Sequence, residues 1–191
     1  LTLAENSVKG LGKKALIVTG KVVTKTGLVS KLTEYLDKWN IEYEIFNDIP
    51  NEPTDKMVEE GVLVYKNTSC DFLIGIGGGS PLDCAKAIAV SVVLGMDFSD
   101  MMGKNLCGEF PPTVMIPTTA GTGSEATKFF VITDTTKDVK MLLAGEDILP
   151  NIAIIDSSFT MTAPPSITAA TGMDALTHAV ESYTSRKGNP I

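Results

Sequence analysis

Hydrophobic and polar positions along the first 94 residues predict three successive strand–helix units. Short runs rich in β-branched residues predict strands, and apolar residues that recur every three or four positions predict helices. The expected strands are residues 14–19, 41–46 and 72–76, and the expected helices are residues 26–39, 55–65 and 82–94. Parallel strands need long crossover connections, so this alternation favours a parallel sheet. The pattern therefore predicts an α/β fold with a doubly wound sheet covered by helices on both faces.

The pattern changes to short strands after about residue 112. These strands are expected at residues 113–116, 129–133, 139–143 and 151–155. The middle two flank a polar turn and should pair with each other.

A final helix is expected to follow Pro164 and Pro165 and to run from residue 166 to residue 183. No second apolar core accompanies this helix in the sequence. We therefore expect residues 1–163 to form the α/β domain and residues 164–191 to begin a second, helical domain whose remainder lies outside this chain.

The composition is that of a globular protein and excludes several classes of partner. The 191 residues are 43% hydrophobic and 20% charged, which is enough to form a core. A net charge of −7 without a basic run repels nucleic acid and anionic lipid surfaces, so neither is an expected partner. No apolar run approaches the roughly 18 residues that cross a bilayer.

The cysteines indicate a reducing compartment. Cys70, Cys84 and Cys107 are an odd number without the spacing of a zinc site. The first ten residues lack the basic and apolar segments of a signal peptide. We expect a cytoplasmic protein with free thiols.

A glycine-rich segment at residues 77–80 joins an expected strand to an expected helix. Glycines let backbone N–H groups approach an anion, and the start of a helix adds a partial positive charge. Ser80 can donate a further hydrogen bond. The segment therefore favours a phosphate site, although glycines at this position can also simply permit a tight turn.

A second loop, at residues 117–125, is rich in small and hydroxyl side chains and also follows a strand. Loops at the carboxyl ends of parallel strands are where open α/β sheets bind ligands. Alone, the segment is typical of an ordinary Ser/Thr-rich turn. The presence of two such loops in one domain favours a cofactor site.

Asp174 and the only histidine, His178, are four residues apart in an expected helix. Their side chains therefore share a face and could bind one divalent ion, although two ligands alone hold a metal weakly. A surface Asp–His pair is the alternative. Glu181, one turn further, could support such a site or simply be solvated.

Three segments together, residues 77–88, 117–125 and 170–181, resemble in order and spacing the signatures of the iron-containing (group III) alcohol dehydrogenase family. The sequence resembles members such as lactaldehyde reductase and 1,3-propanediol dehydrogenase. The resemblance covers the whole chain, and family chains are about twice as long.

The resemblance implies a dehydroquinate synthase-like, Rossmann-type α/β domain that binds NAD or NADP, followed by an all-helical domain. It also implies hydride transfer between the cofactor and a small primary alcohol, diol or aldehyde, with Fe²⁺ as the metal and Zn²⁺ as the alternative. The complete protein would be a homodimer or a larger oligomer.

The resemblance also assigns roles to particular residues. Gly78, Gly79 and Ser80 would hold the pyrophosphate with Asp83 beside them, Thr118, Thr119 and Thr122 would line the cofactor, and Lys140 would lie near the nicotinamide ribose. Asp174 and His178 would be the first two metal ligands, and two histidines outside this chain would complete the set. No catalytic residue beyond the metal ligands is implied.

One position departs from the family pattern. Members that prefer NAD carry an aspartate that accepts hydrogen bonds from the adenosine ribose, and this chain has Asn47 there, followed by Asp48. An asparagine does not repel a 2′-phosphate as a carboxylate does. The choice between NAD and NADP therefore stays open, with NAD favoured if Asp48 substitutes for the missing carboxylate.

Two other functions remain open from the sequence. With half of the metal ligands, this chain is expected to be inactive alone, and it could be a nucleotide-binding module or a truncated domain without activity. It could also be a relative of glycerol dehydrogenase or dehydroquinate synthase, which share the fold but differ in their metal ligands.

Overall fold

The computed structural model describes residues 1, 3–186 and 188. The helices are α1 (Glu5–Lys9), α2 (Lys21–Lys25), α3 (Leu28–Lys38), α4 (Asp55–Asn67), α5 (Gly79–Leu94), α6 (Phe98–Met101) and α7 (Pro165–Thr184). The strands are β1 (Lys14–Val18), β2 (Glu42–Phe46), β3 (Phe72–Gly77), β4 (Thr113–Pro117), β5 (Phe129–Asp134), β6 (Val139–Ala144) and β7 (Ile152–Ala153). Short 3₁₀ helices are η1 (Ser124–Ala126), η2 (Glu146–Ile148) and η3 (Ser157–Phe159).

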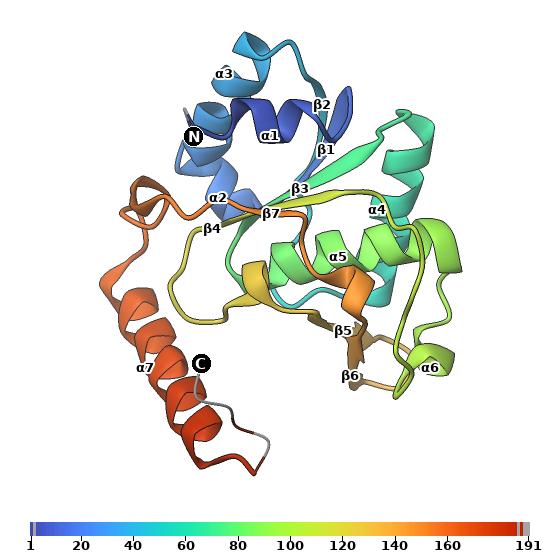
Figure 1. Cartoon of the computed structure of the whole chain (residues 1–191), viewed down its shortest axis with the longest axis vertical. Helices are drawn as coiled ribbons and strands as arrows, with labels where there is room; N and C mark the ends of the chain where they lie inside the picture. Colours follow the sequence, from blue (N-terminus) through green and yellow to red (C-terminus); the bar gives the residue numbers. More distant parts are fainter. Residues whose placement is uncertain (2, 187, 189–191) are drawn as a thin grey trace.

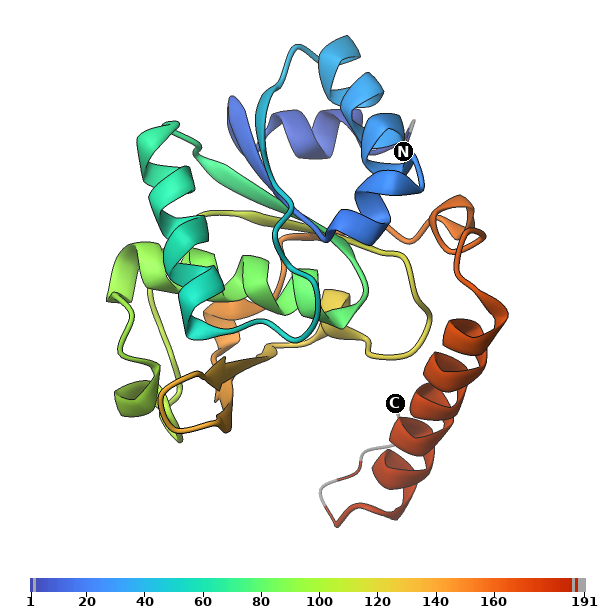
Figure 2. The ribbon, with the colours of Figure 1, turned by 180° about the vertical axis from the view of Figure 1, so that it is seen from behind.

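A parallel sheet in the order β2-β1-β3-β4-β7 forms the centre of the molecule. Helices α1 and α3 lie on one face, and α4 and α5 lie on the other (Figures 1 and 2). Strands β5 and β6 form a separate antiparallel pair beyond α5. This arrangement confirms the doubly wound α/β fold and the strand pair that the sequence predicts.

The alternation of side chains along β1 explains the two cores. Ala15 and Ile17 point to the face covered by α1 and α3, whereas Leu16 and Val18 point to the face covered by α4 and α5. All six residues of β3 are buried, as expected for a central parallel strand.

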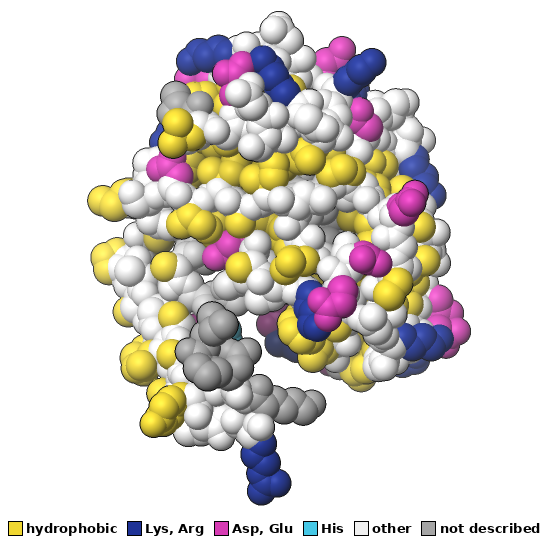
Figure 3. Space-filling model, viewed as in Figure 1, with side chains coloured by type: hydrophobic (Ala, Val, Ile, Leu, Met, Phe, Trp, Pro, Cys, Tyr) yellow, Lys and Arg dark blue, Asp and Glu magenta, His cyan; other side chains and the backbone are white. Residues whose placement is uncertain are grey.

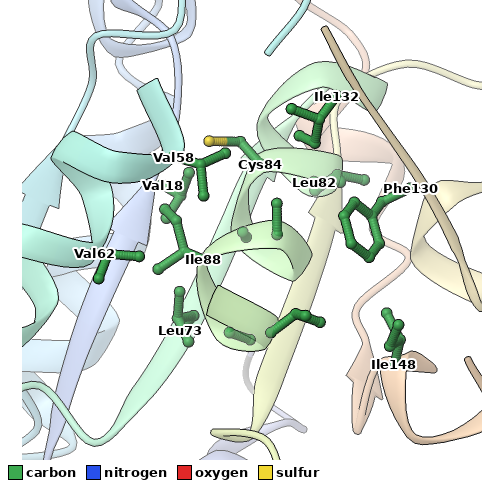
Figure 4. Close-up of a cluster of buried hydrophobic side chains, with 14 of the residues drawn as sticks. Val18, Val58, Val62, Leu73, Leu82, Cys84, Ile88, Phe130, Ile132 and Ile148 are labelled. Carbon is green, nitrogen blue, oxygen red and sulfur yellow. The ribbon is translucent and has the colours of Figure 1, made fainter. Parts of the chain in front are cut away.

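Helix α5 is packed on several sides and is the most deeply buried helix. It contacts β3, β4, α4 and β5. In Figure 4, its Ile88 lies beside Val58 and Val62 of α4, while Phe130 of β5 lies on the opposite side of the helix. Because the surroundings of α5 are apolar, any charged residue on this helix must find partners inside the protein.

Several boundaries differ from those expected. The helix expected at residues 26–39 is α3, which begins at Leu28 because Gly27, in a left-handed conformation (φ +82°), separates it from the unpredicted helix α2. Helix α5 begins at Gly79, earlier than residue 82. The strand expected at residues 151–155 is reduced to β7, and the short helices α1 and α6 were not predicted.

Helix α7 confirms the final predicted helix and has no buried residue. It extends along one side of the molecule, and hydrophobic side chains lie along its surface, among them Ile167, Met173 and Leu176 (Figure 3). The division into two domains near residue 164 stays a prediction. None of the helices formed by the described residues is long and apolar enough to cross a membrane.

Candidate functional site

The first loop of the site is the junction between β3 and α5. Gly78 caps α5 without a side-chain hydrogen bond, so the first N–H groups of the helix have no capping partner from Gly78. These groups and the helix dipole favour an anion at this end of α5. The geometry fits the predicted phosphate site.

The second loop lies against the first. The Thr118 N–H donates to the Gly77 carbonyl at 2.8 Å. A Cβ atom on Gly79 would lie 3.0 Å from Cγ2 of Thr122, and one on Gly78 would lie 3.4 Å from Oγ1 of Thr119. The close approach explains why glycine suits position 79, where a side chain would push into the second loop.

Two pockets meet at these loops. The β1–β2 pocket, of about 330 Å³, is lined by residues that follow β1 and β2, together with Gly78, Thr118 and Thr119. The β5–β6 pocket, of about 590 Å³, is lined by residues of β5 and β6, together with Asp83 and Thr122. Gly79 and Ser80 line both pockets. A helix start that favours an anion, placed between two pockets, is a shape that fits a dinucleotide.

The β5–β6 pocket also contains Lys140 and His178. Lys140 Nζ lies 2.6 Å from Oε1 of Glu52, and both side chains are largely exposed. His178 reaches this pocket from α7, so the structure brings the predicted imidazole ligand to the same pocket as the predicted cofactor residues.

Asp83 lies in the lining of the β5–β6 pocket, but the protein itself occupies its carboxylate. Oδ1 accepts a hydrogen bond from Ser124 Oγ at 2.6 Å, and Oδ2 accepts one from the Val131 N–H at 3.0 Å. Burial raises the pKa of Asp83, and these hydrogen bonds and Lys86 oppose the increase. Asp83 therefore holds the second loop and β5 against α5 through hydrogen bonds, and it also lies near the glycines.

Lys86 belongs to the same region and was not predicted. Only 1% of its surface is exposed, and Nζ donates to the carbonyls of Ser124 and Phe129 at 2.6 and 2.9 Å. Burial lowers the pKa of Lys86 to about 8, and Asp83 and Glu125 oppose this decrease. The available signal was a lysine in an otherwise apolar helix, one turn after an aspartate.

Asp174 and His178 share one face of α7. Oδ1 of Asp174 lies 3.6 Å from Nε2 of His178, and the two side chains are 42% and 54% exposed. This distance is too long for a hydrogen bond, and it leaves both atoms able to contact a common ion. Across residues 1, 3–186 and 188, no three His, Cys, Asp or Glu side chains cluster as a metal site, so Asp174 and His178 have no third ligand among the described residues.

Asn47 is the predicted residue that the structure does not bring to the others. It is half-buried after β2, whereas Asn51 is the asparagine that lines the β1–β2 pocket. Asp48 forms an ion pair with Lys21 at the start of α2. Lys21 thus partly neutralises Asp48, the carboxylate that could take the place of an aspartate at position 47.

Comparison with known proteins identifies the family. The sequence profile described as "Iron-containing alcohol dehydrogenase" matches residues 1–157. NAD-dependent methanol dehydrogenase of Bacillus methanolicus is 43% identical over 181 residues, covering 94% of this chain and 47% of that protein. Lactaldehyde reductase of Escherichia coli K12 is 41% identical over 180 residues, covering 91% of this chain and 46% of that protein.

Structural comparison gives the same result. The crystal structure of a 1,3-propanediol oxidoreductase superimposes with a TM-score of 0.95 at 40% identity, covering 99% of this chain and 50% of that one. The chain belongs to the iron-containing alcohol dehydrogenase family, as the sequence motifs indicate. It spans about half the length of the curated relatives that it matches.

Proposed function

We propose that this chain is the cofactor-binding half of a metal-dependent alcohol dehydrogenase. The enzyme transfers a hydride between NAD or NADP and a small primary alcohol, diol or aldehyde. The observation that carries the proposal is the junction at Gly79 and Ser80, which lies at the start of α5 and connects two pockets. The names of the relatives support the substrate class, and "NAD-dependent" in one of them supports the cofactor.

Each part of the cofactor has a matching part of the site. The pyrophosphate would bind the N–H groups at the start of α5 and the Ser80 hydroxyl. The adenosine half would lie in the β1–β2 pocket, where Val22, Val23 and Ile49 offer apolar surface. The nicotinamide half would then lie in the β5–β6 pocket, with Thr122 and Lys140 in its lining and His178 nearby.

Asp174 and His178 would hold the metal together with ligands from outside this chain. One carboxylate and one imidazole without a thiolate suit Fe²⁺ or Zn²⁺. When bound, the metal would supply a Lewis acid for the substrate oxygen. Because the described residues bring only these two donors together, we propose that this chain has no dehydrogenase activity alone.

The cofactor preference follows from the charges next to the β1–β2 pocket. Asn47 is neutral, and the Asp48 charge is offset by Lys21. A 2′-phosphate would therefore meet little repulsion, and we propose that the site accepts both NAD and NADP. The free thiols of Cys70, Cys84 and Cys107 support a cytoplasmic location.

Calorimetric titration of this chain with NAD⁺ and NADP⁺ tests the proposal. Gly79→Asp should abolish binding, because it adds a side chain against Thr122 and a negative charge at the phosphate junction. Gly10→Asp is the matched control, since it adds the same charge at an exposed position at the end of α1, where a Cβ meets no atom closer than 3.5 Å. Undiminished binding by Gly79→Asp, or no binding by the wild-type chain, would contradict a preformed site.

A further inference from the structure

One buried turn of α5 holds a single segment of the chain in place. Asp83 accepts hydrogen bonds from Ser124 and Val131, at 2.6 and 3.0 Å. Lys86 Nζ donates to the carbonyls of Ser124, Thr127 and Phe129 at 2.6, 2.8 and 2.9 Å, and it lies 3.3 Å from Thr127 Oγ1. The ammonium group therefore connects three separate points of residues 124–129.

This segment forms part of the wall of the β5–β6 pocket. Ser124, Thr127 and Phe129 all line that pocket. Between the short η1 helix and the first residue of β5, the segment has no regular secondary structure. Few backbone hydrogen bonds hold this segment, and Lys86 adds hydrogen bonds to three of its carbonyls.

Burying the ammonium group of Lys86 costs free energy. No carboxylate of the described residues lies within the 4.0 Å that would make an ion pair with Nζ, although Asp83 and Glu125 are close enough to influence its charge. A buried cation without a direct ion pair costs free energy that only its hydrogen bonds offset. A methionine of similar length would fill the space without this cost but would remove the donor that Lys86 supplies to the carbonyls of Ser124, Thr127 and Phe129.

We propose that Lys86 is a positioning residue that fixes residues 124–129 from inside the core and thereby shapes the pocket that receives the nicotinamide half of the cofactor. The identity of the ligand rests on the proposed function, whereas the effect of Lys86 on the segment does not. The β1–β2 pocket contains none of residues 124–129 and should be insensitive to Lys86.

The test uses Lys86→Met in the 191-residue chain, with Lys86→Gln as a second variant that retains one donor group. Ile88→Ala is the matched control, because Ile88 is fully buried on the same helix but packs toward Gly61 of α4. Hydrogen–deuterium exchange without nucleotide measures the mobility of residues 120–131. Calorimetric titration with NAD⁺ and with AMP then separates the two pockets, since AMP can fill only the β1–β2 pocket and the phosphate junction.

Lys86→Met is expected to raise exchange in residues 120–131 about tenfold, the size expected for losing one hydrogen bond to a charged group. It should weaken NAD⁺ binding about tenfold and AMP binding less than twofold. Lys86→Gln should give the same pattern with smaller changes. Ile88→Ala should lower the melting temperature but leave the ratio of NAD⁺ to AMP affinity unchanged.

Unchanged exchange in residues 120–131 of a folded Lys86→Met variant would overturn the inference. Equal weakening of NAD⁺ and AMP would also overturn it, because that result indicates a general structural role. If the wild-type chain binds neither nucleotide, the proposed function fails separately. The exchange experiment then decides alone whether Lys86 fixes the segment.

Discussion

Nε2 of His178 lies 3.6 Å from Oδ1 of Asp174, one turn earlier on α7. The two atoms are on the same face, do not form a hydrogen bond with each other at this distance, and are both accessible to solvent. His178 also lines the β5–β6 pocket, so an ion held by this pair would lie beside the proposed nicotinamide position. In the proposed enzyme, two of the metal ligands would thus be prepared on one helix before the other ligands are added.

The first prediction concerns weak metal binding by this pair. Zn²⁺ should shift the imidazole proton signals of His178, which are easy to assign because the chain has one histidine. Asp174→Asn should reduce the shift at a given Zn²⁺ concentration, since it removes the carboxylate that shares the ion. Asp37→Asn is the control, because it removes an exposed carboxylate from α3, and it should leave the titration unchanged. An identical titration for Asp174→Asn would show that the imidazole binds zinc without its neighbour.

The second prediction concerns the close packing of α4 against α5. A Cβ atom on Gly61 would lie 2.3 Å from Cδ1 of Ile88. Gly61→Ala should therefore destabilise the fold by about 1–3 kcal/mol through overpacking, reduced by the better helix propensity of alanine, about 1 kcal/mol. Urea denaturation measures the free energy of unfolding.

Ile88→Val provides the matched test, because it removes the methyl group that Gly61→Ala would strike. Each variant alone should be less stable than the wild type, and the double variant should be more stable than the sum of the two effects predicts. Strict additivity would mean that the helices move apart to accommodate the new methyl group.

The third prediction concerns the pH dependence of stability. Burial lowers the pKa of Lys86 from 10.5 to about 8. Between these pH values the unfolded chain binds more protons than the folded chain, so raising the pH through this window favours folding as far as Lys86 is concerned. Below about pH 8 the lysine is protonated in both states and contributes no pH dependence.

Lys86→Met removes this contribution. Comparison of this variant with the wild type separates the effect of Lys86 from the effects of Tyr65, Cys70 and Cys84, whose pKa values are raised by burial. The free energy of unfolding of the wild type, relative to that of Lys86→Met, should therefore rise from pH 8 to pH 10. A constant difference between the two proteins across this range would show that Lys86 keeps an ordinary pKa in the folded chain.

The sequence predicts correctly those elements that depend on residues close together in the chain. Buried parallel strands such as β3 are continuous apolar runs, so their positions were readable, and so was the glycine junction that follows β3. The sequence does not predict α2, because this helix has only five residues, none of them buried, and the left-handed Gly27 separates it from α3.

The sequence predicts the role of α5 only in part, because this role depends on contacts between residues that are far apart in the sequence. Asp83 was interpreted as a neighbour of the cofactor, yet its partners Ser124 and Val131 are 41 and 48 residues away in the sequence. Lys86 was missed because a lysine on a helix is normally solvated. Only the packing of β5 and β6 over α5 shows that this lysine is buried.

The last prediction concerns the choice of cofactor. Lys21 forms an ion pair with Asp48 beside the β1–β2 pocket, and Val22 and Val23, the next residues, line that pocket. Lys21→Met should leave the Asp48 carboxylate uncompensated, so NADP⁺ affinity should fall about five- to tenfold relative to NAD⁺, the effect of about 1 kcal/mol of added repulsion near the surface. Lys21→Met combined with Asp48→Asn should restore the wild-type ratio, because it removes the repelling charge as well. Calorimetric titration at low salt measures both affinities, and an unchanged ratio in Lys21→Met would place the 2′-hydroxyl of the adenosine ribose away from this ion pair.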